Sequence, residues 1–111
     1  MRIAVDFDGT IVEHEYPKIG KPISGAIEAL LKFQDAGHDI ILWTYRYGDT
    51  LRDAVKYCEE NGIKLYAANQ SEPDEILAEG ESRLIRADVF IDDRNVGGLL
   101  PWAVIEKYIL G

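Results

Sequence analysis

The sequence predicts a single α/β domain built on a parallel sheet. Short apolar runs alternate with stretches of helical periodicity along all 111 residues, which is typical of strands joined by crossing helices. Hydrophobic residues make up 47% of the chain, enough for one core but not for two. Polar residues with distinctive chemistry follow several of the apolar runs, at the strand ends where parallel sheets bind ligands.

The first half of the chain predicts two strands and the helix between them. Residues 2–7 and 39–44 are apolar runs of strand length, and each ends in polar residues. Residues 27–31 carry apolar side chains at helical spacing, and Gly37 provides a helix stop. The loop between the first strand and this helix contains glycine and proline, and we expect it to form a rim of the site.

The second half repeats the pattern. Residues 51–58 carry an apolar helical stripe, with Asp49 or Thr50 as the expected N-cap and Gly62 as the stop. A short third strand is expected over residues 64–68.

A fourth strand is expected over residues 87–93, and it too ends in acids. Pro101 and Trp102 then open a final helix, because proline is favoured in the first turn.

Charge and cysteine content limit the classes of function. A net charge of −8 and a pI near 4.6 argue against a nucleic-acid or anionic-membrane surface. Asp6 interrupts the first apolar run too early for a signal peptide or a membrane span, so we expect a cytoplasmic protein. The single cysteine, Cys58, lies on the apolar stripe and is interpreted as a buried structural residue.

The most distinctive local feature is the run from Asp6 to Thr10. Asp6 and Asp8 are spaced i, i+2 at the end of a strand, so both emerge on the same side. Two such charges about 4 Å apart would repel by roughly 4 kcal/mol at an effective dielectric near 20, and a bound dication would reverse that cost. Gly9 lets the backbone bend back toward the site, and Thr10 adds a hydroxyl.

The other strands also end in polar residues. Thr44 follows the second strand, Asn69 the third, and Asp92 and Asp93 the fourth. Because the carboxyl ends of parallel strands share one edge of a sheet, these side chains are expected to converge there with Asp6.

This ordered set resembles the haloacid dehalogenase superfamily, through Asp6-Phe7-Asp8-Gly9-Thr10, Thr44 and Ile91-Asp92-Asp93. No insert is long enough to form a cap, and the stretches 42–46 and 91–95 are similar to small bacterial and phage hydrolases of the capless branch. The resemblance implies a Rossmann-like three-layer α/β fold with strand order 4-1-2-3, formed by residues 1–111 without a cap domain. It also implies a Mg²⁺-dependent phosphatase.

The resemblance assigns roles to the acids. Asp6 would be the nucleophile that forms an aspartyl-phosphate, and Asp8 the general acid and then the base. Mg²⁺ would bind a carboxylate oxygen of Asp6, the backbone carbonyl of Asp8, and Asp93, with Asp92 in the outer shell. Which of the adjacent pair touches the metal stays open.

Substrate contacts are assigned less directly. Gly9 and Thr10 are expected at the substrate, and Thr44 would hydrogen-bond a phosphoryl oxygen, unless it only caps the following turn. Arg46 is expected to contact phosphate or substrate, with a solvated loop charge as the alternative. Asn69 is expected to meet the substrate, although asparagine is common in turns.

One part of the family pattern is absent. A lysine is expected shortly before the fourth strand, but residues 82–87 contain none. Arg83 is the preferred replacement, Arg86 the second and Lys64 the third. His14 lacks metal-ligand spacing to the other histidine and is interpreted as an exposed or locally bonded residue.

Other interpretations stay open. The missing lysine favours, as an alternative, a catalytically weak metal-binding or interaction domain of the same fold. A receiver-like phosphoacceptor is disfavoured because the third strand ends in Ala68-Asn69 rather than in aspartate. With no cap, substrate selectivity would come from loops around the site or from a neighbouring subunit, so a homo-oligomer is a further expectation.

Overall fold

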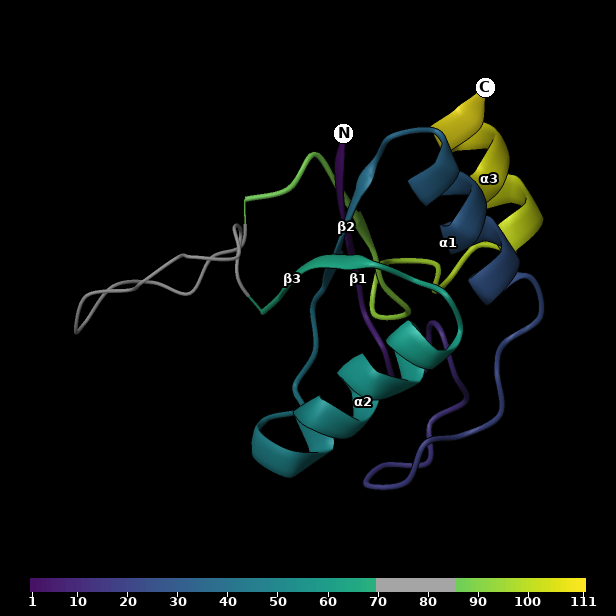
Figure 1. Ribbon diagram of the computed structural model, residues 1–111. Helices are drawn as coiled ribbons and strands as arrows, with labels where there is room; N and C mark the ends of the chain where they lie inside the picture. Colours follow the sequence, from purple (N-terminus) through teal and green to yellow (C-terminus); the bar gives the residue numbers. More distant parts are fainter. Residues whose placement is uncertain (70–85) are drawn as a thin grey trace.

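The computed structural model describes residues 1–69 and 86–111. Its elements, shown in Figure 1, are in chain order β1 (Arg2–Val5), α1 (Ala26–Asp35), β2 (Asp39–Leu42), α2 (Gly48–Glu60), β3 (Leu65–Ala68), β4 (Val89–Ile91) and α3 (Trp102–Leu110). The preferred lysine replacement, Arg83, lies outside the described residues.

The four strands form one parallel sheet in the order β3-β2-β1-β4. This is the predicted order 4-1-2-3 seen from the other edge, so the Rossmann-like α/β class is confirmed. Val5 pairs with Leu42 on one side and with Ile91 on the other. The residues that follow these strands, among them Asp6 and Asp92, therefore emerge at the same edge.

The main core lies between the sheet and the three helices. Alternate strand residues face this core, which is the period of a β-strand, and they are Ile3, Val5, Ile40, Leu42 and Ile91. Phe33 of α1, Cys58 of α2 and Trp102 of α3 pack against them. Helices α1 and α3 lie side by side, joined by a salt bridge of 2.7 Å from Lys32 Nζ to Glu106 Oε1.

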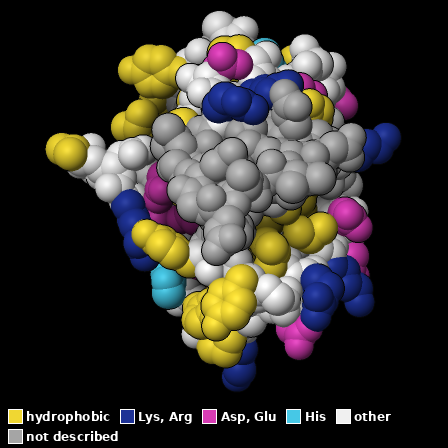
Figure 2. Space-filling view, turned by 90° about the vertical axis from the view of Figure 1, so that its left-hand side faces the viewer, with side chains coloured by type: hydrophobic (Ala, Val, Ile, Leu, Met, Phe, Trp, Pro, Cys, Tyr) yellow, Lys and Arg dark blue, Asp and Glu magenta, His cyan; other side chains and the backbone are white. Residues whose placement is uncertain are grey.

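The opposite face of the sheet carries a smaller apolar cluster. Ala4, Ile41 and Ala67 are buried there, with half-buried Trp43 and Tyr66 packed against them. Within the ranges 1–69 and 86–111, no helix packs on this cluster. Figure 2 views the molecule from the left-hand side of Figure 1 and shows acidic, basic and hydrophobic side chains intermingled around the residues drawn in grey.

The predicted helix stops are confirmed, but the predicted N-cap of α2 is wrong. Gly37 and Gly62 follow α1 and α2 with φ of 90° and 83°, conformations that glycine adopts without steric cost. Helix α2 begins at Gly48 after Tyr47, before either Asp49 or Thr50. The helix therefore begins earlier than its apolar stripe, which starts at Leu51, indicates. Thr50 lies within the first turn, where its hydroxyl donates to the Tyr47 carbonyl at 2.8 Å.

Cys58 is fully buried, as predicted. Its burial, and to a smaller extent the nearby Glu59 carboxylate, raises the pKa of the Cys58 thiol to about 12. The thiol therefore acts as a small apolar core group.

The helices in the described part of the chain are each too short to cross a lipid bilayer.

Candidate active site

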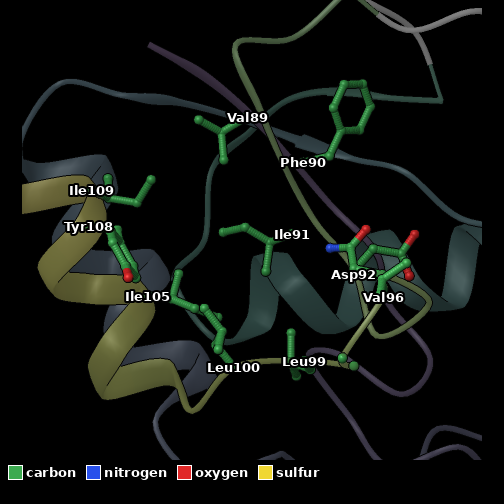
Figure 3. Close-up of a pocket in the computed structure, with 13 residues that line it drawn as sticks. Val89, Phe90, Ile91, Asp92, Val96, Leu99, Leu100, Ile105, Tyr108 and Ile109 are labelled. Atoms are coloured by element: carbon green, nitrogen blue, oxygen red, sulfur yellow. The ribbon is translucent and has the colours of Figure 1, made fainter.

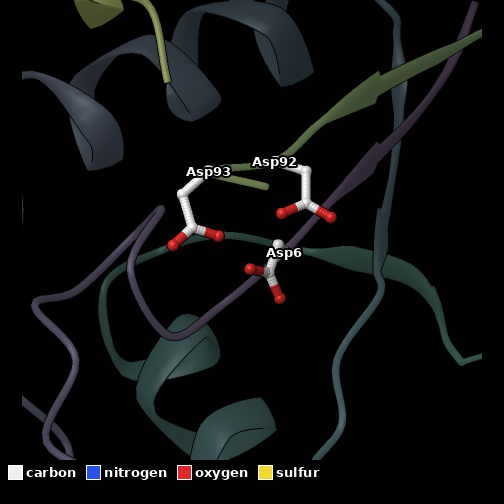
Figure 4. Close-up of side chains that lie close together, drawn as sticks. All are labelled: Asp6, Asp92 and Asp93. Atoms are coloured by element: carbon white, nitrogen blue, oxygen red, sulfur yellow. The ribbon is translucent and has the colours of Figure 1, made fainter. Parts of the chain in front are cut away.

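Three carboxylates converge at the carboxyl edge of the sheet. Asp6 follows β1, and Asp92 and Asp93 follow β4, the strand beside it. Each offers an oxygen atom, and these oxygens all lie within 4.8 Å of one another. Figure 4 shows the three side chains close together. The parallel register of β1 and β4 brings them together, although Asp92 lies 86 positions after Asp6 in the sequence.

This crowding disfavours the charged form of Asp6. Burial is the largest cause, followed by repulsion from Asp92 and by a hydrogen bond to and repulsion from Asp93; a hydrogen bond from the Phe7 backbone opposes them. Together they raise the pKa of Asp6 from its ordinary 3.8 to about 7. A cation among the three carboxylates would reverse the repulsion.

Asp93 has an oxygen that needs a partner. Its Oδ1 atom is buried and accepts no hydrogen bond from any described residue. A buried carboxylate oxygen left in this way is costly, and Mg²⁺ prefers such oxygens as ligands. Asp92 differs, because its Oδ1 already accepts a hydrogen bond from the Arg94 backbone N–H at 2.9 Å. The donor set therefore fits Mg²⁺, and it favours Asp93 as a direct ligand.

Thr10 connects the two acidic segments. Its hydroxyl donates to Asp6 Oδ2 at 3.4 Å and accepts the backbone N–H of Asp93 at 3.2 Å. Its carbonyl accepts the indole N–H of Trp102 at 3.0 Å. Thr10 is fully buried, so the expected substrate contact is corrected to a positioning role beneath the acids.

Gly9 is required by a close approach of the backbone. Its φ is +85°, and a Cβ atom there would collide with the Asp93 carboxylate. Only glycine lets Asp93 reach the centre of the site. The structure thus places Gly9 against an acid, whereas the sequence interpretation placed it at the substrate.

Asp8 is held apart from the three other acids by Arg46. The guanidinium donates from Nε to Asp8 Oδ2 at 2.8 Å and from Nη2 to Asp8 Oδ1 at 2.7 Å. This is the bidentate geometry that fits an arginine to a carboxylate. Both side chains are removed from water, with 0% of the Arg46 side chain and 12% of the Asp8 side chain exposed.

The remaining donors of Arg46 are also occupied. Three backbone carbonyls accept from it, those of Pro17 at 3.2 Å, Lys18 at 2.8 Å and Thr50 at 3.4 Å. With the two bonds to Asp8, these match all five N–H groups of a guanidinium. The expected contact of Arg46 with substrate is therefore corrected, because this buried side chain fixes Asp8 instead.

Aromatic rings complete the Arg46 environment. Its guanidinium carbon lies 5.1 Å from the centroid of the Phe7 ring and 5.2 Å from that of Tyr16. Both distances are within the range of a cation–π interaction. Phe7, just after β1, and Tyr16 in the following loop thus both hold Arg46 in place against Asp8.

Asn69 supports the loop that carries Thr44. Asn69 has a φ of 54°, and its Oδ1 accepts the Thr44 backbone N–H at 2.8 Å. Thr44 Oγ1 in turn accepts the backbone N–H of Arg46 at 3.1 Å, which is the turn-capping alternative. The Thr44 hydroxyl can still donate its own proton, and Thr44 lines the site. Asn69 positions this loop and is not among the residues that line the cavity.

A cavity of about 290 Å³ opens beside the acids. Its lining residues are Asp6, Asp8, His14, Tyr16, Thr44, Tyr45 and Arg94. Four of these were not predicted as site residues: His14, Tyr16, Tyr45 and Arg94. The sequence signal for His14 and Tyr16 was their place in the predicted rim loop. Tyr45 and Arg94 directly follow Thr44 and Asp93, the polar ends of two strands.

Two expected replacements for the lysine lie far from this cavity. Lys64 precedes β3 and Arg86 precedes β4, so both lie toward the amino ends of the strands, opposite the acids. Arg86 lines a separate hollow with Met1 and Asp39. Neither residue therefore supplies positive charge to the site in this structure, and Arg83 lies outside the described residues.

A second cavity, of about 400 Å³, lies between β4 and α3. Figure 3 shows its apolar lining, with Ile91 of β4 opposite Ile105 and Ile109 of α3. Asp92 contributes a carboxylate at one end. Apart from Asp92, none of the predicted site residues lines this cavity.

A solved structure of a conserved protein from Bacteroides thetaiotaomicron superposes on this chain with a TM-score of 0.92 and 50% sequence identity. The match covers 99% of this chain and 89% of the other. No protein-family profile and no curated protein sequence matches the chain.

Proposed function

Because this chain belongs to the family of that conserved Bacteroides protein, whose description names no reaction, we propose its function from the site itself. The proposal is a Mg²⁺-dependent phosphohydrolase that acts on a phosphorylated small molecule or another phosphate ester. The observation that carries it is the buried Oδ1 of Asp93, which accepts no hydrogen bond from the described residues and lies in a cluster that also contains Asp6 with its raised pKa.

Mg²⁺ would be held by Asp6 and Asp93, with Asp92 in support. It would supply the positive charge that stabilises phosphoryl oxygens during transfer. Phosphate monoesters are among the slowest compounds to hydrolyse unaided, so orientation by the protein alone would not suffice. Four aspartates at one sheet edge suit this chemistry, because Mg²⁺ prefers oxygen ligands.

In the proposed reaction, a carboxylate oxygen of Asp6 attacks phosphorus. A bond forms between that oxygen and phosphorus, the bond to the ester oxygen breaks, and Asp8 gives a proton to the departing alcohol. Water then attacks the aspartyl-phosphate, Asp8 takes its proton, and inorganic phosphate leaves. The Thr44 hydroxyl would donate to a phosphoryl oxygen.

The contact with Arg46 orients Asp8 for this role. A carboxylate has about four lone-pair sites, and Arg46 occupies one on each oxygen. The others can exchange a proton with the substrate or with water, while the bidentate contact fixes their direction. Such fixed orientation is a large part of enzymatic rate enhancement.

Two further parts of the proposal concern the setting of the protein. The lone buried thiol fits a reducing, cytoplasmic compartment. The substrate would be selected by the residues around the cavity or by a second subunit that closes it.

The decisive experiment is a screen of phosphate esters with and without Mg²⁺. We expect the wild type to release phosphate from an activated aryl phosphate only with Mg²⁺, and Asp6→Asn and Asp8→Asn to lose this activity while circular dichroism shows them folded. Asp53→Asn on the exposed surface of α2 is the matched control and should retain full activity. Mg²⁺ binding without phosphate release from any ester would instead support the inactive metal-binding domain.

A further inference from the structure

We propose that Arg94, held against the ring of Tyr45, is the cation that binds the phosphoryl group in this cavity. The inference rests on the proposed function and deepens it, because it assigns the positive charge that the expected lysine does not supply. Arg94 directly follows Asp92 and Asp93, the acidic pair at the end of β4.

The charges around the cavity show why such a cation is needed. Asp6 and Asp8 line the cavity, and Asp92 and Asp93 lie beside it. A phosphate ester brings further negative charge to this place, and one dication balances only part of the total. The buried Arg46 cannot contribute, because its donors are all directed to Asp8 and to backbone carbonyls.

Arg94 has the position that this role requires. Among residues 1–69 and 86–111, Arg94 is the only lysine or arginine that lines the cavity. Its backbone N–H donates to Asp92 Oδ1 at 2.9 Å, which fixes the residue beside the acids. It forms no salt bridge with a carboxylate of the described residues. Its charge is therefore not neutralised by those groups.

The contact with Tyr45 orients the guanidinium without using its donors. The guanidinium carbon lies 4.4 Å from the centroid of the Tyr45 ring, which is cation–π distance. A cation–π contact uses the charge of the guanidinium rather than its N–H groups, so these groups can still donate to a ligand. That planar set of donors matches phosphate oxygens bidentately.

Tyr45 lies exposed on the loop that follows β2. Its side chain is 78% exposed, and it follows Thr44, the proposed donor to the phosphoryl group. The ring thus brings Arg94, which follows β4, to the loop that follows β2, across the central strand β1. The phosphoryl group would then lie between Thr44 and Arg94, above Asp6.

The test measures binding of inorganic phosphate by titration calorimetry with Mg²⁺ present. We expect Arg94→Ala to weaken phosphate binding at least tenfold, Arg94→Lys to weaken it less, and Tyr45→Ala to weaken it severalfold. Arg52→Ala is the matched control, because Arg52 is an exposed arginine on α2 that pairs with Asp49, and it should stay within twofold of the wild type. The affinity for Mg²⁺ alone should be unchanged in Arg94→Ala, since the metal ligands are intact.

The possible results separate this inference from the proposed function. If Arg94→Ala binds phosphate like Arg52→Ala, or if the wild type binds no phosphate with Mg²⁺, the role of Arg94 is refuted, whatever the ester screen shows. If phosphate binding depends on Arg94 but no ester is hydrolysed, the anion site stands and the hydrolase proposal fails. If both hold, the KM of Arg94→Ala for an active ester should rise with the same fold-change as its phosphate affinity falls.

Discussion

Asp6→Asn is expected to stabilise the metal-free protein at alkaline pH and to abolish its response to Mg²⁺. The pKa of Asp6 rises from 3.8 to about 7 on folding, chiefly because the carboxyl group is buried and then because Asp92 repels it. Between these two values the folded chain holds a proton that the unfolded chain releases. Wild-type stability therefore falls as the pH rises through this window, and the loss is complete above pH 7.

The magnitude follows from the two pKa values. Relative to low pH, the raised pKa of Asp6 lowers the free energy of unfolding by about 2 kcal/mol at pH 5 and about 4 kcal/mol at pH 8, and this loss vanishes below the unfolded pKa. Asparagine carries no charge, avoids this loss at every pH, and can keep the contact with the Thr10 hydroxyl. The stability advantage of Asp6→Asn should thus grow by about 2–3 kcal/mol between pH 5 and pH 8.

The assay is urea unfolding with a chelator, followed by circular dichroism at several pH values. Asp53→Asn is the control for the loss of one exposed carboxylate and should show no such trend. Added Mg²⁺ should stabilise the wild type, by about 2.7 kcal/mol at a hundred times its Kd, but not Asp6→Asn. The reasoning is refuted if the advantage of Asp6→Asn does not change with pH, or if the variant gains as much stability from Mg²⁺ as the wild type.

Three further predictions concern residues around the site. Arg46→Ala should lower the free energy of unfolding by about 3–5 kcal/mol, because it leaves the largely buried Asp8 carboxylate unpaired. Arg46→Lys should lower it by less, since lysine keeps the charge. Equal losses of stability in urea unfolding would contradict the bidentate role of Arg46. Gly9→Ala should weaken Mg²⁺ binding at least tenfold in calorimetry, because the added Cβ displaces Asp93; unchanged affinity would show that Asp93 is not a ligand. Cys58 should react with a thiol reagent at least a hundredfold more slowly in native than in unfolded protein, since burial raises the pKa of its thiol to about 12. Rapid labelling of the native protein would contradict the place of Cys58 in the core.

The fold and the acidic end of the site could largely be predicted from the sequence. Apolar periodicity defines the strands and helices, and strands joined by helices form parallel pairs. Once Asp6 and the pair Asp92 and Asp93 are placed after β1 and β4, they must meet at one edge of the sheet. The N-cap of α2 could not be placed in this way, because the apolar stripe starts at Leu51 whereas the helix begins at Gly48.

The partners of the loop side chains could not be predicted. The sequence indicated Arg46 as a substrate contact and Thr10 as a substrate-binding residue, but both are buried supports of the acids. Arg46 reaches Asp8 across 38 residues, through a loop path that periodicity does not describe. Arg94 showed no sequence signal beyond following the acidic pair, because its proposed role depends on where the Tyr45 ring lies.

The sequence by itself therefore determined which chemical groups gather at the sheet edge, since strand periodicity and parallel connections set the positions of Asp6, Asp92, Asp93 and Thr44. Only the tertiary structure decided how the charges are paired. Asp8 is matched to Arg46, whereas Asp93 keeps an oxygen that no described residue satisfies. The physical reason is that hydrogen bonds and ion pairs act over about 3 Å, so they depend on loop conformations that a pattern of apolar residues does not specify.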